Sequence, residues 1–142
     1  MSTTTVKLTK AFWNGEYNVR ILKFKSRTLT LCIDSASICE ARTKLDIEDL
    51  LNHVYEKIKN KRRVTIYIDR GKIYYRHGKS KKIRLRNLWI CSSCGKIITK
   101  EYITWCRTCE LPMHEYKVVE YSFCEWTDEL GEPACIEHRD YA

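Results

Sequence analysis

The chain is poor in residues that interrupt regular structure, because only two prolines and five glycines occur among its 142 residues. It has no low-complexity segment and no internal repeat of useful length, which excludes collagen-like and repeat architectures. Hydrophobic residues make up 44% of the sequence, so a disordered chain is excluded as well. We therefore expect one globular domain, or two small ones that share a core.

Long apolar runs are also absent. No stretch approaches the ~20 apolar residues that a membrane-spanning helix needs. The first ten residues, MSTTTVKLTK, are polar and then basic, without the apolar segment of a secretory signal. We expect an intracellular protein of the cytoplasm or nucleus, neither secreted nor bound to a membrane.

Acidic residues are scarce before residue 91. Residues 1–90 hold 21 Lys and Arg against 8 Asp and Glu, a net charge of +13. Residues 91–142 hold 5 against 10, a net charge of −5. This division predicts a polyanion-binding face on the first part only. The acidic second part offers a different surface, on which a protein partner can dock.

Alternating polar and apolar residues, interrupted by turn signals, predict several strands in the first part. Asn14-Gly15 is a strong two-residue turn and indicates a β-hairpin over about 4–25, and RTLTLCI predicts a third strand. A second hairpin is expected around the DRG turn at 69–71. The segment KKIRLRNLWI predicts a further strand that leads directly into Cys91.

One amphipathic helix is predicted within TKLDIEDLLNHVYEKIKNKRR, residues 43–63. Its apolar residues recur at helical spacing and form one face: Ile47, Leu50, Leu51, Val54, Tyr55 and Ile58. Thr43 and Asp46 have the spacing of a capping box. Acidic residues near the start of this helix and lysines near its end interact favourably with the helix dipole.

These elements follow the order β-β-β-α-β-β-β. We therefore expect an α+β fold, with a small antiparallel sheet and one amphipathic helix, followed by a C-terminal β-rich zinc-finger module. In domain terms, residues 1–88 form a basic α+β domain and residues 89–142 an acidic, cysteine-rich zinc-binding domain. Because no flexible linker separates the two, we expect the second to be packed on the first.

Eight candidate metal ligands follow residue 90 in four successive pairs: Cys91 and Cys94, Cys106 and Cys109, His114 and Cys124, Cys135 and His138. Two residues between paired thiolates let both sulfurs face one ion, and Gly95 permits the tight turn after the first pair. The pattern predicts one zinc ion, and a second if all eight residues are ligands. Such Cys-rich sites are closed and structural.

Two pairings of these ligands fit the spacing. In one, the four cysteines within 91–109 form a zinc ribbon, and the other four residues form a separate site. In the other, the pairs interleave, so that the first and third pairs share one ion and the second and fourth share the other.

The interleaved order resembles the cross-brace of plant homeodomain and RING fingers over about residues 89–138. The first half of the string also looks like a zinc ribbon or a treble-clef knuckle. Two features differ from the plant homeodomain pattern: nine residues separate His114 from Cys124, and Pro133 stands where that family has a tryptophan.

Cys32 and Cys39 have no further thiol or histidine near them in the sequence. We interpret them as buried free thiols, with a redox pair as the alternative.

Basic residues gather between 61 and 86, with tyrosines among them. The candidate nucleic-acid-binding residues are: Lys61, Arg62, Arg63, Arg70, Lys72, Arg76, Lys79, Lys81, Lys82, Arg84, Arg86, Tyr74 and Tyr75. In a strand, Lys82, Arg84 and Arg86 point the same way and lie ~7 Å apart, which roughly matches phosphate spacing. The alternative is a solvated sheet face whose lysines protect an edge.

No catalytic motif is present, so we expect a protein that is not an enzyme. The preferred hypothesis is a zinc-stabilised nucleic-acid-binding protein, with RNA favoured because tyrosines can stack on bases. The alternative is a protein–protein interaction adaptor that acts through the zinc module. In size and composition, the chain also looks like small viral accessory proteins, including plant-virus suppressors of RNA silencing.

Overall fold

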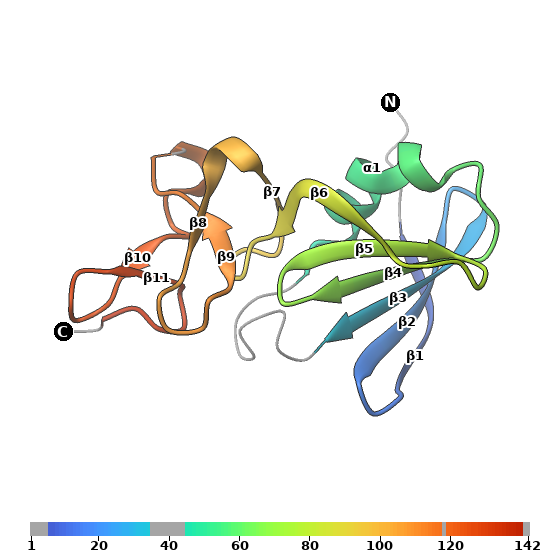
Figure 1. Cartoon of the computed structure of the whole chain (residues 1–142), viewed down its shortest axis with the longest axis horizontal. Coiled ribbons are helices and arrows are strands. Elements are labelled where there is room, and N and C mark those ends of the chain that lie inside the picture. The colour runs from blue at the N-terminus through green and yellow to red at the C-terminus, as the bar shows by residue number, and fades with distance from the viewer. Residues whose placement is uncertain (1–5, 35–44, 118, 141–142) are drawn as a thin grey trace.

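The protein's structure, a computed structural model, describes residues 6–34, 45–117 and 119–140. A large twisted sheet lies at one end of the molecule, and short strands and turns lie at the other (Figure 1). The elements follow in this order: β1 (Lys7–Trp13), β2 (Tyr17–Phe24), β3 (Arg27–Asp34), α1 (Ile47–Ile58), β4 (Val64–Asp69), β5 (Lys72–His77), β6 (Ile83–Ile90), β7 (Ile97–Thr99), η2 (Lys100–Tyr102), β8 (Ile103–Trp105), β9 (Pro112–His114), η3 (Val119–Tyr121), β10 (Trp126–Thr127) and β11 (Pro133–Ala134).

The expected fold class is wrong, because the fold is mostly β. Strands β1 to β7 form one seven-stranded sheet whose spatial order follows the sequence. Neighbouring strands are antiparallel except β3 and β4, which are parallel. The helix α1 joins these two strands, and a crossover of this kind places the strands it connects in parallel. The sheet is larger than expected because β7, from the cysteine-rich part, pairs with β6.

Tight turns set the antiparallel register. The Asn14-Gly15 hairpin is confirmed, since β1 pairs with β2 across it. Lys25 and Ser26 join β2 to β3 with φ values of 49° and 64°. The next hairpin, β4–β5, is confirmed at Arg70-Gly71, where φ is 52° and 80°. Two successive left-handed residues are the geometry of a type I′ turn, which matches the twist of paired strands.

The helix begins later than the capping-box spacing indicates. Its N-cap is Asp46, whose Oδ1 accepts a hydrogen bond from the backbone N–H of Asp49 at 2.9 Å. Thr43, the expected cap, lies outside the described residues. Four apolar residues predicted for the inner face are buried: Leu50, Leu51, Val54 and Ile58.

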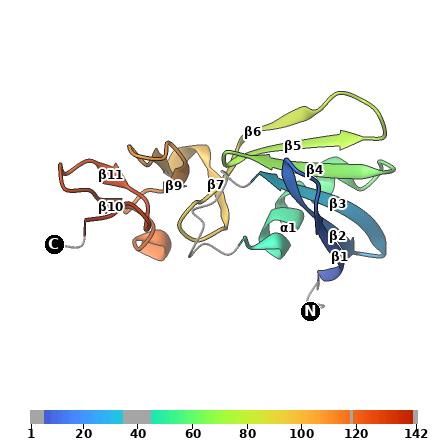
Figure 2. The ribbon, with the colours of Figure 1, turned by 90° about the horizontal axis from the view of Figure 1, so that it is seen from below.

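The main core lies between α1 and one face of the sheet (Figure 2). The sheet supplies alternate residues of β2 to β5 to it: Leu22, Phe24, Leu29, Leu31, Ile33, Val64, Ile66, Ile68, Ile73 and Tyr75. Because strand side chains alternate in direction, the intervening residues point to the opposite face. We call that opposite face the open face, because α1, the one α-helix in the described residues, does not cover it.

A second core lies in the cysteine-rich part. Two small sheets, β8–β9 and β10–β11, surround it. Its buried members are: Cys91, Ile98, Cys106, Leu111, Met113, Cys124, Ala134 and Cys135. Half of these side chains are thiols, so this core depends on candidate metal ligands rather than on large apolar groups.

The two parts of the chain meet closely. Cys91 follows the last residue of β6 directly, and Gly71 in the β4–β5 turn lies against Pro112 of β9. The division into domains at residue 89 stays a prediction, although β7 extends the sheet beyond that point. The part of the chain that the structure describes holds no helix long and apolar enough to span a membrane.

Candidate metal centres and open sheet face

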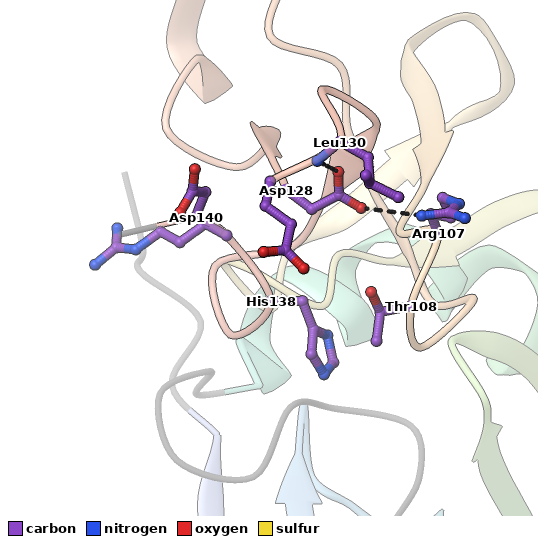
Figure 3. Close-up of a pocket in the computed structure, with 8 residues that line it drawn as sticks. Arg107, Thr108, Asp128, Leu130, His138 and Asp140 are labelled. Carbon is purple, nitrogen blue, oxygen red and sulfur yellow. Dashed lines mark hydrogen bonds and ion pairs between the residues drawn. The ribbon is translucent and has the colours of Figure 1, made fainter. Parts of the chain in front are cut away.

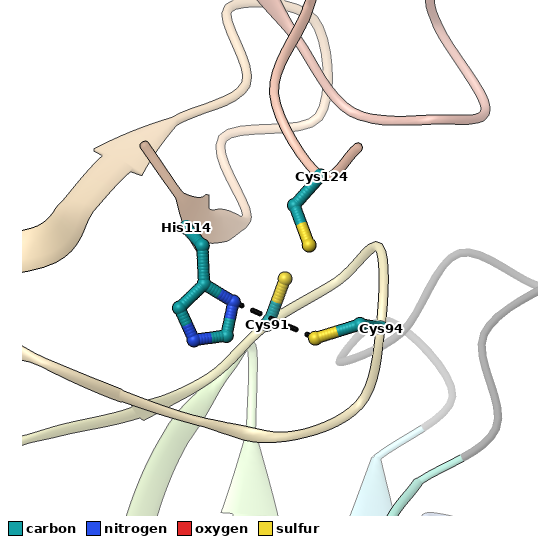
Figure 4. Close-up of side chains that lie close together, drawn as sticks. All are labelled: Cys91, Cys94, His114 and Cys124. Atoms are coloured by element: carbon teal, nitrogen blue, oxygen red, sulfur yellow. Dashed lines mark hydrogen bonds between the residues drawn. The ribbon is translucent and has the colours of Figure 1, made fainter. Parts of the chain in front are cut away.

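The first centre gathers Cys91, Cys94, His114 and Cys124 (Figure 4). Their ligand atoms all lie within 4.8 Å of one another. Cys91 and Cys94 come from the turn after β6, His114 from the end of β9, and Cys124 from the segment after η3. Cys91 and Cys124 are fully buried and His114 is 2% exposed. Three sulfurs and one nitrogen around one point form a set that can hold a metal ion.

Neighbouring groups orient the donors of this centre. The Nε2 atom of His114 lies 3.0 Å from the carbonyl oxygen of Ile97 and donates to it, which leaves Nδ1 to face the three sulfurs. The Tyr121 ring stacks on the imidazole, with centroids 3.7 Å apart and planes 8° from parallel. We call the turn that carries Cys91 and Cys94 the first knuckle. In it, Gly95 adopts a φ of 79° and its N–H donates to the carbonyl oxygen of Cys91 at 2.8 Å.

The three thiols of the first centre lie so close together that each shifts the pKa of the others. Burial raises the pKa of Cys91, but hydrogen bonds from Cys124, Cys94 and His114 outweigh it and lower that pKa overall. For Cys94, the hydrogen bond from Cys124 lowers the pKa, whereas Cys91 and burial raise it to about 12. Hydrogen bonds with Cys91 and Cys94, and burial, raise the pKa of Cys124. Without a cation, one thiolate therefore keeps its neighbours protonated, and a divalent ion would let all three ionise.

The second centre gathers Cys106, Cys109, Cys135 and His138, again with ligand atoms within 4.8 Å of one another. The Nδ1 atom of His138 lies 3.2 Å from Cys135 Sγ and 3.6 Å from Cys106 Sγ. We call the turn that carries Cys106 and Cys109 the second knuckle, and Glu110 occupies in it the position that Gly95 has in the first. Its φ is 61°, and its N–H donates to the carbonyl oxygen of Cys106 at 2.8 Å.

The structure therefore forms the interleaved arrangement. The first and third ligand pairs make one cluster, and the second and fourth make the other. The sequence spacing did not decide between this order and a separate ribbon. The deciding feature is the long return of the chain through β9 and η3, which carries His114 and Cys124 back to the first knuckle.

The first centre is tied to the start of α1. Asp46 donates its backbone N–H to the carbonyl oxygen of Gly95 at 3.0 Å, and its carboxylate pairs with Lys96 at 3.0 Å. The carboxylate of Asp49 accepts a hydrogen bond from the N–H of Ile97 at 2.8 Å. The knuckle thus supplies partners to the first turn of the helix that covers the main core.

A polar cavity of about 480 Å³ adjoins the second centre (Figure 3). Arg107, from the second knuckle, pairs with Asp128 at 3.6 Å. Asp128 Oδ1 also accepts hydrogen bonds from the backbone N–H groups of Leu130 and Glu132. Hydrogen bonds from Glu132 and Leu130, with the Arg107 charge, lower the pKa of Asp128 against the effect of burial. These contacts close the loop between β10 and β11 beside His138.

On the open face, one residue from each of six strands forms a continuous line, which we call the six-strand row. Its members are cross-strand partners in succession: Phe12, Val19, Cys32, Tyr67, Tyr74 and Arg84. At ~4.8 Å per strand, the row is ~24 Å long. Val19, Cys32 and Tyr67 at its centre are only 3%, 6% and 7% exposed and form a third small core cluster. The members that remain accessible are Phe12 at one end and Tyr74 and Arg84 at the other.

Two further cations cover the aromatic part of the row. The Nζ atom of Lys82 lies 4.0 Å from the centroid of the Tyr67 ring and 5.6 Å from that of Tyr17. The Arg76 guanidinium lies 5.6 Å from the Tyr67 centroid. Its Nε is buried and has no hydrogen-bond partner among the described residues. Cations held over aromatic rings in this way can also meet an anion, although the charge of Lys82 already acts on the nearby carboxyl group of Asp69.

Cys32, inside the row, is a neutral thiol. Burial raises its pKa, and the charges of Lys82 and Arg76 offset part of that effect. The prediction that Cys32 is a buried free thiol is confirmed, whereas Cys39 lies outside the described residues. At one border of the face, burial and a hydrogen bond with Asp34 raise the pKa of Asp69.

The remaining predicted basic residues lie in several places. Lys72 is on the open face beside the row, whereas Arg70, in the β4–β5 turn, lies 3.9 Å from Glu110. Tyr75 points to the core and is 8% exposed. Arg86 borders a groove between β6 and α1. The others flank the sheet: Lys61, Arg62 and Arg63 precede β4, and Lys79 and Lys81 precede β6.

The part of the open face that β1 and β2 contribute was not predicted from the sequence. Phe12, Val19 and Tyr17 were not predicted to accompany the later tyrosines. The Asn14-Gly15 turn does fix the pairing of Phe12 with Val19, so that part of the register could have been derived. The step from Cys32 to Tyr67 could not, because it depends on the parallel β3–β4 pair.

Comparison with protein-family models, with curated proteins and with solved structures found no match to this chain. The function is therefore inferred from the geometry of its own residues.

Proposed function

We propose that each of the two clusters binds one Zn²⁺ ion. Each cluster offers three cysteine sulfurs and one imidazole nitrogen, close enough together to surround one ion, and structural zinc prefers this donor set. Metal analysis of protein purified without chelators tests this directly, and we expect two zinc ions per chain. Replacement of Cys91 by Ser should remove one ion and replacement of Cys106 by Ser the other, whereas unchanged zinc content would refute the ligand assignment.

We further propose that the open face binds single-stranded nucleic acid, in preference RNA, and that the protein is a binding protein rather than an enzyme. The observation that carries this proposal is the six-strand row, in which Lys82 and Arg76 lie over the Tyr67 ring and the partly exposed Tyr74 ring lies beside it. Bases stack on aromatic rings at ~1–3 kcal/mol each, and cations beside the rings meet the phosphates. The net charge of +13 on residues 1–90 attracts such a ligand from a distance.

Stacking can be separated from general charge attraction by removal of one ring. Tyr74→Ala removes a half-buried ring of the row, whereas Tyr116→Ala removes an exposed ring of the cysteine-rich part. Fluorescence titration with a short unstructured RNA should show Tyr74→Ala at least about 5-fold weaker, from the energy of one stacked base, and Tyr116→Ala unchanged. Equal affinity of both variants to the unmodified protein would argue against the row as the binding surface.

A second candidate function is that of a protein–protein adaptor. Seven of the eleven exposed large hydrophobic residues among those described lie in the cysteine-rich part: Tyr102, Trp105, Tyr116, Val119, Phe123, Trp126 and Leu130. Such exposure marks interaction surfaces in monomeric proteins. A Phe123→Ser variant that keeps RNA affinity but loses a partner retained by the unmodified protein would favour this function.

A further inference from the structure

A cationic hollow lies between β6 and α1, and none of the residues that line it is a candidate metal ligand. It encloses about 300 Å³, at the lower end of the ~300–1,000 Å³ range of small-molecule sites. Six of its lining residues set its chemistry: His53 and Lys57 from α1, Tyr75 from β5, and Arg84, Leu85 and Arg86 from β6. We call it the α1–β6 groove.

The groove has an apolar floor and a cationic rim. Tyr75 and Leu85 at the floor are 8% and 6% exposed, while Lys57, Arg84 and Arg86 at the rim are exposed to solvent. A ligand that satisfies both regions carries a flat apolar body and a negative group. A nucleotide has both parts, since its base can lie on the floor and its phosphate can meet the rim.

Polar groups that can read a base edge are present as well. The β7 strand pairs with β6 only at Leu88–Ile90, so within the described ranges the outer edge of residues 83–87 has no strand partner. Backbone N–H and C=O groups of such an edge remain available to a ligand. The Nδ1 atom of His53 donates to the carbonyl oxygen of Asp49 at 2.8 Å, which leaves Nε2 for a hydrogen bond with the base.

We infer that the α1–β6 groove holds one nucleotide of the strand bound on the open face, with its base over Tyr75 and Leu85 and its phosphate between Lys57 and Arg86. Arg84 connects the two surfaces, because it ends the six-strand row and also borders the groove. The strand thus continues around the edge of β6. This inference rests on the proposed function. An acidic peptide shares part of this chemistry, but only a nucleic-acid strand also continues the row of rings and cations.

The test uses the full zinc-loaded chain and 5′-mononucleotides of the four RNA bases as probes. Chemical shifts in NMR spectra should change at His53, Lys57 and Leu85. The matching nucleosides and inorganic phosphate should each bind about tenfold more weakly, since each lacks one of the two contacts. Shifts with an acidic, leucine-containing peptide and none with nucleotides would overturn the inference in favour of a protein ligand.

A matched pair of charge reversals on α1 supplies the second readout. Lys57→Glu alters the rim, whereas Lys59→Glu changes the same charge on a lysine that pairs with Glu56 at 2.7 Å and does not line the groove. We expect Lys57→Glu to weaken mononucleotide binding about tenfold and short-RNA binding at least about threefold, with Lys59→Glu within about twofold of the unmodified protein.

The outcomes separate the two proposals. If the unmodified protein binds RNA and the two variants bind it equally well, the groove inference is overturned and the open-face function stands. If mononucleotides bind but RNA affinity is unaffected by Lys57→Glu, the groove takes free nucleotides and not the bound strand. If the unmodified protein binds no RNA even at low salt, the proposed function itself fails.

Discussion

Gly71 is constrained by two features of its surroundings. Its φ of 80° lies in the left-handed region, and a Cβ at this position would lie 2.5 Å from the Cδ and Cγ atoms of Pro112. Its carbonyl oxygen also accepts a hydrogen bond from the N–H of Ile90 at 2.9 Å. The sequence predicts the turn from its DRG residues, but not the contact, because nothing in the local pattern brings Pro112 to it.

Replacement of Gly71 by Ala should therefore cost more than the left-handed backbone alone explains. Gly78 provides the matched control, because its φ is 59° but nothing lies within 4 Å of a Cβ there. We expect Gly78→Ala to lower the free energy of unfolding by ~1–2 kcal/mol, and Gly71→Ala by about 2 kcal/mol more, since the Pro112 ring must move. Urea denaturation of both variants measures the difference, and equal losses would contradict the close contact.

Asp46 caps α1 and pairs with Lys96 of the first knuckle. The hydrogen bond from Asp49 and the contact with Lys96 outweigh the effect of burial and lower the pKa of Asp46 below the ordinary aspartate value of 3.8. A lowered pKa means that the charged form stabilises the fold above 3.8 and that this contribution is lost as the pH falls through the folded-state pKa. Asp46→Ala should cost about 1 kcal/mol, as for other N-caps.

Asp46→Asn separates the cap from the charge, because an asparagine oxygen can still accept the Asp49 hydrogen bond but does not titrate. In unfolding measurements from neutral pH downward, the stability gap between the unmodified protein and this variant should shrink below pH 3.8. A gap that stays constant would show that the ionised carboxylate contributes nothing beyond the cap.

At the scale of elements, most strands and the helix could be predicted from local sequence patterns. The strands, the two glycine-containing hairpins and the inner face of α1 follow from residue alternation and turn chemistry. The Lys25-Ser26 turn has no glycine or asparagine, so its left-handed conformation depends on the pairing of β2 with β3. The parallel β3–β4 pair and the addition of β7 are long-range choices, which explains why the predicted sheet was too small and wholly antiparallel.

The two metal centres should differ in their effect on these elements. The first contacts α1 through Asp46 and Asp49 and borders β7, whereas the second is enclosed by the small sheets. Cys91→Ser should therefore speed amide hydrogen exchange at Ile97 and in the first turn of α1, since structural zinc supplies folding energy. Cys106→Ser should speed exchange mainly within residues 103–140, and identical exchange patterns in the two variants would contradict this division.

For the whole molecule, the division of charge predicted a basic surface on the first part of the chain and an acidic surface on the second. The structure shows which residues of each part lie side by side. The eight candidate ligands were identified from their spacing alone, but their grouping into two clusters depends on the fold. Likewise, the basic residues were evident from composition, whereas the six-strand row could be recognised only from the register of the sheet. The pattern also did not give the surroundings of single residues: Tyr75 lies in the core and borders the α1–β6 groove, and Arg70 lies beside Glu110.

The most direct test of the central claim is the salt dependence of RNA binding. Lys82→Glu with Arg84→Glu removes two cations of the open face, and Lys100→Glu with Lys117→Glu makes the same charge change on exposed residues of the cysteine-rich part. If the open face binds the strand, the first variant should bind more weakly and lose about 1.4 from the slope of log affinity against log salt, at ~0.7 per phosphate contact. The second should keep the slope of the unmodified protein. Equal losses in both variants would mean that only net charge matters, and would contradict a nucleic-acid interface on the open face.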